Sequence, residues 1–166
     1  DELKHAVPNL KENPEFLSFL ANYANMGILS TIIFIGVGTI LTLIVQSSSA
    51  AMALTLVMCY EGYIPFELAA AMVLGENIGT TITALLAAVG TTTNAKRAAR
   101  AHAMFNLFGV GVVFAFLPYY LDFIEWLIPG QADVILEDGS KPNIATHIAA
   151  SHTIFNITAT ILFLPF

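Results

Sequence analysis

Long apolar runs separated by short polar clusters dominate the chain. Residues 16–60 contain no Asp, Glu, Lys, Arg or His. As a helix these roughly 45 residues would extend ~68 Å, more than twice the ~30 Å of a bilayer core. Further stretches without Asp, Glu, Lys or Arg cover residues 77–95, 101–121 and 142–166. The pattern predicts several membrane-spanning helices.

The first half of the pattern predicts a connector helix followed by a hairpin. In residues 1–25 apolar side chains recur at helical spacing behind Asn13 and Pro14, which indicates an amphipathic interfacial or connecting helix. The apolar runs 26–45 and 50–60 are separated only by polar residues. The second run is too short to cross a bilayer, at about 16 Å of helix, so we predict a re-entrant hairpin with the polar residues at its tip.

The second half predicts further helices around a polar break. We expect one spanning helix interrupted at Gly75–Thr81, which reads GENIGTT. The elements expected after it are a basic loop (90–100), a span (101–117), an interfacial segment (119–128), a polar connection (129–142) and a last span (144–166). The fold class predicted is therefore an all-α integral membrane protein. Residues 26–166 are expected to form one membrane unit, and the chain is interpreted as a piece of a longer protein.

Composition supports this class. Hydrophobic residues make up 57% and charged residues 11% of the chain, and the mean hydropathy is +0.75. These values conflict with a soluble helical binding protein. The net charge of −6 leaves no basic surface for nucleic acid. No catalytic triad pattern, phosphate-binding loop or cysteine pair indicates an enzyme.

Four consecutive polar residues, Gln46, Ser47, Ser48 and Ser49, form the first candidate site. They must face protein or a watery cavity, because lipid would leave their polar groups unsatisfied. Neutral oxygens suit a dehydrated sodium ion, and hydroxyl and amide donors suit an oxyanion. The alternative is that the serines bond to helical carbonyls or connect helices.

The GENIGTT segment is the second candidate site. Its glycines would let the helix unwind, and its polar residues Asn77, Thr80 and Thr81 would then line a ligand site. The alternative is a glycine-rich helix contact with the threonines bonded to their own helix. Glu76 is an ionisable group at membrane depth, which makes it a candidate sodium ligand or proton-linked carboxylate.

Two similar boxes lie further along the chain. Residues 102–106 read HAMFN and residues 152–156 read HTIFN, and both are predicted to mark helix starts. Their polar members are His102, Asn106, His152 and Asn156. The ring nitrogens of His102 and His152 are expected to cap or bridge helices and not to bind metal. The basic residues Lys96, Arg97 and Arg100 predict that their loop is cytoplasmic.

The motifs QSSSA, GENIGTT and RAARAHAMFN, in this order, resemble the sodium-dependent phosphate cotransporter family, type II and its bacterial relatives. The resemblance implies two inverted repeats, of which this chain would be the second, C-terminal one. It also implies that Gln46–Ser49 contact substrate and sodium, with Asn77, Thr80 and Thr81 lining the partner segment. Glu76 stands where the family more commonly has a small residue.

The resemblance implies sodium/phosphate symport in a bacterial inner membrane. Sodium would be the coupling ion, with no cofactor and no further metal. The partners implied are inorganic phosphate, sodium, the lipid bilayer, and either the missing N-terminal repeat or a second copy of this chain. An alternative hypothesis is a non-transporting membrane module that binds a partner or senses phosphate.

Overall fold

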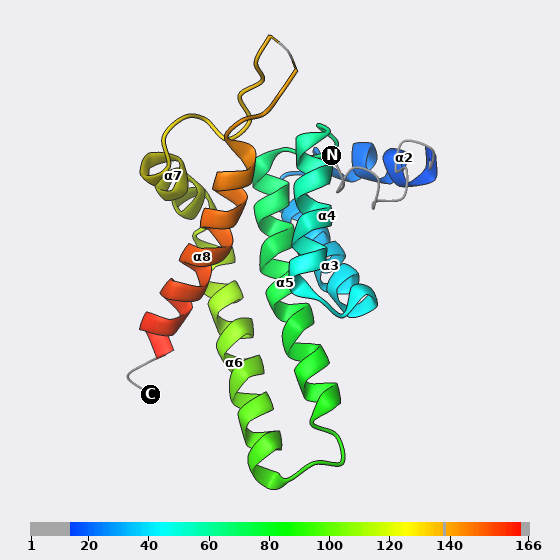
Figure 1. Cartoon of the computed structure of the whole chain (residues 1–166), viewed down its shortest axis with the longest axis vertical. Helices are drawn as coiled ribbons and strands as arrows, with labels where there is room; N and C mark the ends of the chain where they lie inside the picture. Colours follow the sequence, from blue (N-terminus) through cyan, green and yellow to red (C-terminus); the bar gives the residue numbers. More distant parts are fainter. Residues whose placement is uncertain (1–13, 138, 164–166) are drawn as a thin grey trace.

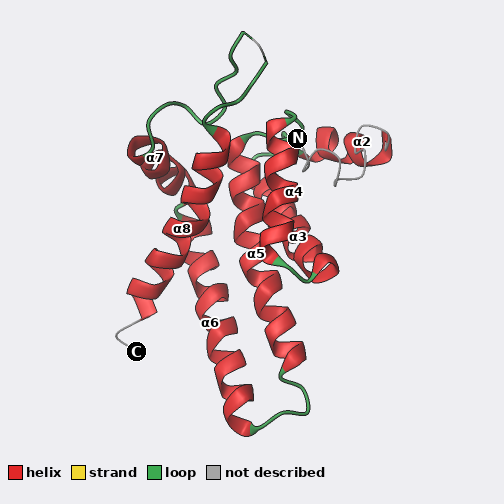
Figure 2. Ribbon diagram, in the orientation of Figure 1, coloured by secondary structure: helices red, strands yellow, loops and turns green. Residues whose placement is uncertain are grey.

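The chain folds into a bundle of helices with connecting turns. The computed structural model describes residues 14–137 and 139–163, and Figure 2 shows helices and loops but no strands in these ranges. The elements are α2 (Pro14–Tyr23), α3 (Ile28–Val45), α4 (Ser48–Tyr60), α5 (Phe66–Ala87), α6 (Thr93–Ala115), α7 (Leu117–Leu127) and α8 (Ile144–Phe163). The predicted all-helical fold class is therefore confirmed.

Helix α5 is the centre of the bundle. It packs against α3, α4, α6 and α8 (Figure 1), and residues 68–77 are buried without interruption. A helix that is buried on all sides is expected when its sequence is apolar or small all round, as in LAAAMVLG before Glu76. The polar residues within this stretch, Glu76 and Asn77, therefore lie inside the protein.

Helices α3 and α4 form a hairpin beside α5. Val45 ends α3, and only Gln46 and Ser47 separate it from α4, so the predicted interruption of the apolar run is confirmed. The last turn of α3 lies against α5 at Gly79, where an added Cβ would be 2.6 Å from the Thr42 Cβ. Because α5 continues to Ala87, the hairpin tip lies part-way along the bundle and not at its end (Figure 1).

The predicted break at Gly75–Thr81 is wrong. Helix α5 runs without interruption through this segment. The glycines serve close helix packing instead: a Cβ on Gly75 would overlap the Ile35 carbonyl oxygen, and a Cβ on Gly38 would overlap that of Met72. Small residues let two helix backbones approach in this way.

Two further boundaries differ from the expectation. The basic segment is helical and not a loop, since α6 begins at Thr93 and contains all three basic residues. The Thr92 hydroxyl caps this helix by accepting a hydrogen bond from the Ala95 N–H at 3.3 Å. The two boxes at His102 and His152 consequently lie inside α6 and α8 and not at helix starts.

Three of the described helices are long and apolar enough to cross a bilayer, namely α3, α5 and α6. Helix α8 occupies the range of the last expected span but is not among them. Its sequence includes His147, Ser151, His152 and Asn156, which lower its apolar character. The aromatic segment expected at the interface is helical as α7, which begins two residues earlier than expected, at Leu117.

Helices α2 and α7 lie at the periphery, across the direction of the longer helices (Figure 1). Helix α2 falls within the expected connector of residues 1–25, of which residues 1–13 lie outside the described range. Its role as a connector stays a prediction. Helix α7 is joined to α8 by the Tyr120 hydroxyl, which donates to the Ser151 carbonyl oxygen. Burial raises the pKa of Tyr120 to about 12, so the phenol remains a donor.

Candidate functional site

The tip of the α3–α4 hairpin, Gln46–Ser49, carries polar side chains. Gln46 and Ser49 are exposed, whereas Ser47 and Ser48 are half-buried. Gln46 adopts a left-handed conformation (φ 55°, ψ 25°), which costs a non-glycine residue roughly 1 kcal/mol. Such backbone strain is typical of functional sites and tight turns.

Hydrogen bonds at the tip stay local. The Ser47 hydroxyl accepts from the Ala50 N–H at 3.3 Å and lies 3.2 Å from the Ser49 hydroxyl. Ser47 thereby caps α4, whose first-turn N–H groups point toward the tip. These bonds join the serines to an N–H group of α4 and to each other, and not to a helical carbonyl or to another helix, so they do not support the alternative expected for the serines. The amino end of α4 remains a place where an anion would be stabilised.

Glu76 lies in the seam between α4 and α5. Its side chain is 1% exposed, and its Oε1 accepts a hydrogen bond of 2.7 Å from the Thr55 hydroxyl of α4. Its Oε2 is buried without a hydrogen-bond partner. Thr55 is itself completely buried, so this pair is a polar contact in the interior of the bundle.

The register of the seam brings the two predicted motifs together. A short turn at residues 61–65 makes α4 and α5 antiparallel neighbours, and the Thr55–Glu76 bond fixes which residues are level. Ser48 precedes Thr55 by two turns, about 10 Å. Thr80 and Thr83 follow Glu76 on the same face of α5. The hairpin tip is therefore level with the Thr80–Thr83 stretch, and Glu76 lies between that level and the α4–α5 turn.

The other polar residues of GENIGTT bond within α5. Asn77 donates to the Val73 carbonyl oxygen at 2.8 Å, and Thr81 donates to that of Ile78 at 2.7 Å. Thr80 donates to the Glu76 carbonyl oxygen at 2.8 Å. This is the alternative weighed for the threonines, and it leaves their oxygen lone pairs as acceptors. Asn77 and Thr81 share a face turned by about 100° from Glu76.

The two boxes have the same local structure. Asn106 donates its side-chain amide to the His102 carbonyl oxygen at 3.2 Å, and Asn156 donates to that of His152 at 2.8 Å. Asn106 is buried and His102 is exposed. No group of His, Cys, Asp and Glu that could hold a metal ion occurs in residues 14–137 and 139–163.

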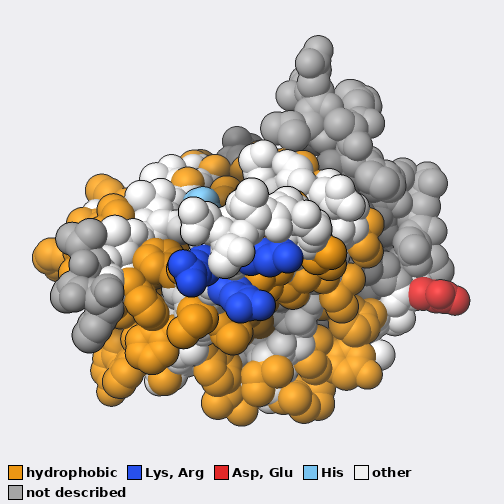
Figure 3. All heavy atoms as spheres, turned by 90° about the horizontal axis from the view of Figure 1, so that it is seen from below, with side chains coloured by type: hydrophobic (Ala, Val, Ile, Leu, Met, Phe, Trp, Pro, Cys, Tyr) orange, Lys and Arg blue, Asp and Glu red, His pale blue; other side chains and the backbone are white. Residues whose placement is uncertain are grey.

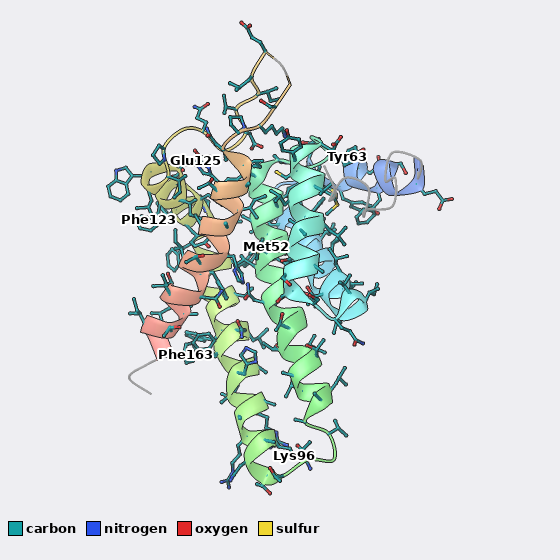
Figure 4. All side chains as sticks on the ribbon, in the orientation of Figure 1. Met52, Tyr63, Lys96, Phe123, Glu125 and Phe163 are labelled. Atoms are coloured by element: carbon teal, nitrogen blue, oxygen red, sulfur yellow. The ribbon has the colours of Figure 1, made fainter. Side chains whose placement is uncertain are left out.

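The basic cluster gathers at the opposite end of α5 and α6 from the α7–α8 connection (Figure 1). Seen from that end, Lys96, Arg97 and Arg100 form one group next to hydrophobic side chains (Figure 3). Figure 4 places Lys96 near the α5–α6 turn and Glu125 and Tyr63 near the other end. The three basic residues therefore lie at one end of the long axis of the bundle.

At the other end, the connection between α7 and α8 holds the turn between α4 and α5. The Asp133 carboxylate accepts from the Phe66 N–H at 3.0 and 3.2 Å, which caps α5. Lys141 is buried and donates to the Cys59 carbonyl oxygen at 2.8 Å, and its Nζ lies 4.0 Å from Asp133. The sequence analysis missed this clamp, because Asp133 and Lys141 are far from α4 and α5 along the chain.

Thr55 was also missed. A signal existed, because Thr55 follows Ser48 by seven residues and so lies on the same helical face. The apolar residues around it hid that relationship.

Known proteins are similar to this chain over a range that includes both polar motifs. The family model described as Na+/Pi-cotransporter matches residues 16–122, which include α3 to α6 and both polar motifs. The Bacillus subtilis (strain 168) protein YqeW is 38% identical over 129 residues, which are 78% of this chain and 38% of that protein. No solved structure matches the chain.

Two mammalian relatives are similar over shorter stretches. Sodium-dependent phosphate transport protein 2C of Mus musculus is 42% identical over 88 residues, which are 51% of this chain and 15% of that protein. Sodium-dependent phosphate transport protein 2B of Homo sapiens is 42% identical over 78 residues, which are 45% of this chain and 11% of that protein. The chain thus matches well under half the length of each of these relatives.

Proposed function

Because the chain belongs to the Na+/Pi-cotransporter family, we propose that it forms one half of the transport domain of a sodium-coupled phosphate symporter. The observation that carries this proposal is the register of the α4–α5 seam. The Thr55–Glu76 bond places the Gln46–Ser49 tip level with the polar face of α5. A single site can therefore draw on both motifs.

Phosphate binds at the hairpin tip in this proposal. The amino end of α4 supplies N–H donors and a positive dipole, and Gln46, Ser47, Ser48 and Ser49 supply amide and hydroxyl donors. These groups suit a tetrahedral oxyanion, and the sodium-dependent phosphate transport proteins among the relatives favour phosphate.

Sodium binds beside it through oxygen ligands. The candidates are the Thr80 and Thr81 hydroxyl oxygens, the Asn77 amide oxygen and the Glu76 carboxylate, together with serine oxygens of the tip. Asn77 and Thr81 lie on a face of α5 turned away from Glu76, so they serve a second ion or line the passage to the first.

The chain provides one of two inverted repeats, and alternating access arises from movement of one repeat against the other. We propose that the α3–α4 hairpin is re-entrant, since its tip ends part-way along the bundle. The partner is the N-terminal repeat of the same polypeptide or a second copy of this chain. The protein lies in a bacterial inner membrane, and the end that carries Lys96–Arg100 is cytoplasmic.

The test is phosphate uptake into proteoliposomes that hold the product of the complete reading frame. Wild-type protein and the control variant Thr153→Leu, which alters an exposed hydroxyl bonded to its own helix, should take up labelled phosphate under an inward sodium gradient. Ser48→Leu should abolish this uptake while inserting normally. Normal uptake by Ser48→Leu would exclude the site, and no uptake by folded wild-type protein would favour the non-transporting module.

A further inference from the structure

A cavity opens at the basic end of the bundle, between the carboxyl end of α5 and the first two turns of α6. Its volume is about 240 Å³. Two of the residues that line it are the cations Lys96 and Arg100, which are one helical turn apart and therefore share a face of α6. The other lining residues are apolar or small, namely Leu85, Ala88, Val89 and Gly90.

The two cations of this cavity have no acidic partner. Residues 77–121 contain no Asp or Glu, and the ion pairs found in residues 14–137 and 139–163 lie at the other end of the bundle, around Lys141 and His147. In Figure 3 the acidic group in view lies at the rim of the molecule, away from the basic residues. The carboxyl end of α5 and the amino end of α6 carry opposite partial charges, which largely cancel. The cavity is therefore positive and needs an anion from outside the described chain.

Apolar surface beside the cavity indicates that this anion has a hydrocarbon part. Val89, which lines the cavity, is 75% exposed. Met104 and Leu107 follow Arg100 by about one and two turns on the same side of α6, where they line an apolar hollow. They are 69% and 62% exposed. A free inorganic ion would use the cations alone, whereas a lipid would cover the apolar surface as well.

We propose that this cavity binds the phosphate of an anionic phospholipid. The Arg100 guanidinium donates two parallel hydrogen bonds to the phosphate oxygens, and the Lys96 ammonium adds a second positive charge. The acyl chains lie along Met104 and Leu107. Basic pockets between membrane helices bind lipid headgroups in this way. The lipid site is separate from the proposed transport site, because the hairpin tip lies part-way along the bundle and the cavity at its end (Figure 1).

Lipid-dependent thermal stabilisation tests the site. The product of the complete reading frame is melted in detergent with increasing mole fractions of phosphatidylglycerol, which is anionic, or of phosphatidylcholine, which is zwitterionic. A ligand that binds the folded state raises the melting temperature. Wild-type protein should respond to a lower mole fraction of phosphatidylglycerol than of phosphatidylcholine. Lys96→Gln and Arg100→Gln should each need about fivefold more phosphatidylglycerol for the same increase.

Arg97→Gln is the matched control. It removes the same charge from the same turn of α6, but Arg97 does not line the cavity. All three basic residues are exposed, so the variants should melt like wild type without added lipid. Arg97→Gln should respond to phosphatidylglycerol almost as wild type does. Equal weakening of Arg97→Gln and Arg100→Gln would indicate diffuse attraction and overturn the site, and so would equal wild-type responses to the two lipids.

Inorganic phosphate distinguishes the lipid from the free anion. Sodium phosphate, compared with sodium chloride, should stabilise wild-type protein through the proposed transport site, and Arg100→Gln should keep this response. If Arg100→Gln loses the response to inorganic phosphate, the cavity binds the free anion and the lipid proposal is overturned. If wild-type protein responds to phosphatidylglycerol but not to inorganic phosphate, the result contradicts the transport site and leaves the lipid site supported.

Discussion

The Thr55 hydroxyl donates to the Glu76 Oε1 at 2.7 Å across the seam between α4 and α5. This bond joins the helix that follows the hairpin tip to the helix that carries GENIGTT. The contact lies in the buried interior, where Thr55 is 0% and Glu76 is 1% exposed.

Removing this donor should destabilise the bundle. Thr55→Val keeps the shape of the side chain but leaves the buried Glu76 carboxyl group without its hydrogen bond, which costs about 1–3 kcal/mol. The free energy of unfolding in detergent measures the loss. The control is Thr160→Val, where the exposed hydroxyl bonds only to the Asn156 carbonyl oxygen. Equal stability of the two variants would contradict the buried contact.

The contact between α3 and α5 at Gly38 has no room for a methyl group, so Gly38→Ala should destabilise the protein. A Cβ at this position overlaps the Met72 carbonyl oxygen, so Gly38→Ala must separate α3 from α5. Overpacking of this kind typically costs about 1–3 kcal/mol. Gly36→Ala is the matched control, because a Cβ on Gly36 of the same helix meets nothing within 4 Å. Thermal unfolding of both variants measures the difference in stability. A Gly38→Ala protein as stable as the Gly36→Ala protein would exclude the close contact.

The clamp that Asp133 and Lys141 form at the α4–α5 turn should stabilise the folded protein, because Asp133 caps α5. Asp133→Ala removes the acceptor of the Phe66 N–H, and loss of such a cap costs about 1 kcal/mol. Glu137→Ala removes an exposed carboxylate from the same connection and should leave stability unchanged. Denaturant unfolding that ranks the two variants in the opposite order would argue against the cap.

The two ends of the bundle should label from opposite sides of the membrane. Lys96→Cys lies at the basic end and Glu137→Cys in the α7–α8 connection at the other end (Figure 1). The native Cys59 is fully buried, so a membrane-impermeant thiol reagent should not reach it. In intact cells the reagent should modify only Glu137→Cys, and after permeabilisation it should modify both variants. Labelling of Lys96→Cys in intact cells would reverse the proposed orientation.

Sequence reasoning identified the elements that depend on local composition. The helical hairpin followed from polar residues set between two apolar runs, and the structure ends α3 at Val45. The glycines of GENIGTT were misinterpreted, because a glycine that unwinds a helix and a glycine that admits a neighbouring helix look the same without the neighbour. Here the neighbour is α3, which packs against Gly75 and Gly79, and α5 is continuous through both glycines.

Long-range contacts could not be predicted from local patterns. Asp133 and Lys141 appear in the sequence as ordinary polar residues of a connection, yet they cap α5 and hold α4. The start of α6 was placed too late, because basic residues were assigned to a loop although Thr92 caps a helix that contains them. In both cases the deciding partner is a backbone N–H or carbonyl group, which the sequence does not show.

Coupled flux is the most direct measurement of the proposed symport. Proteoliposomes that contain the product of the complete reading frame are supplied with labelled sodium and labelled phosphate together and separately. The account predicts that sodium uptake rises when phosphate is present and that phosphate uptake requires sodium, with potassium unable to replace it. Sodium uptake that does not depend on phosphate, or phosphate uptake that proceeds equally well in potassium, would contradict it.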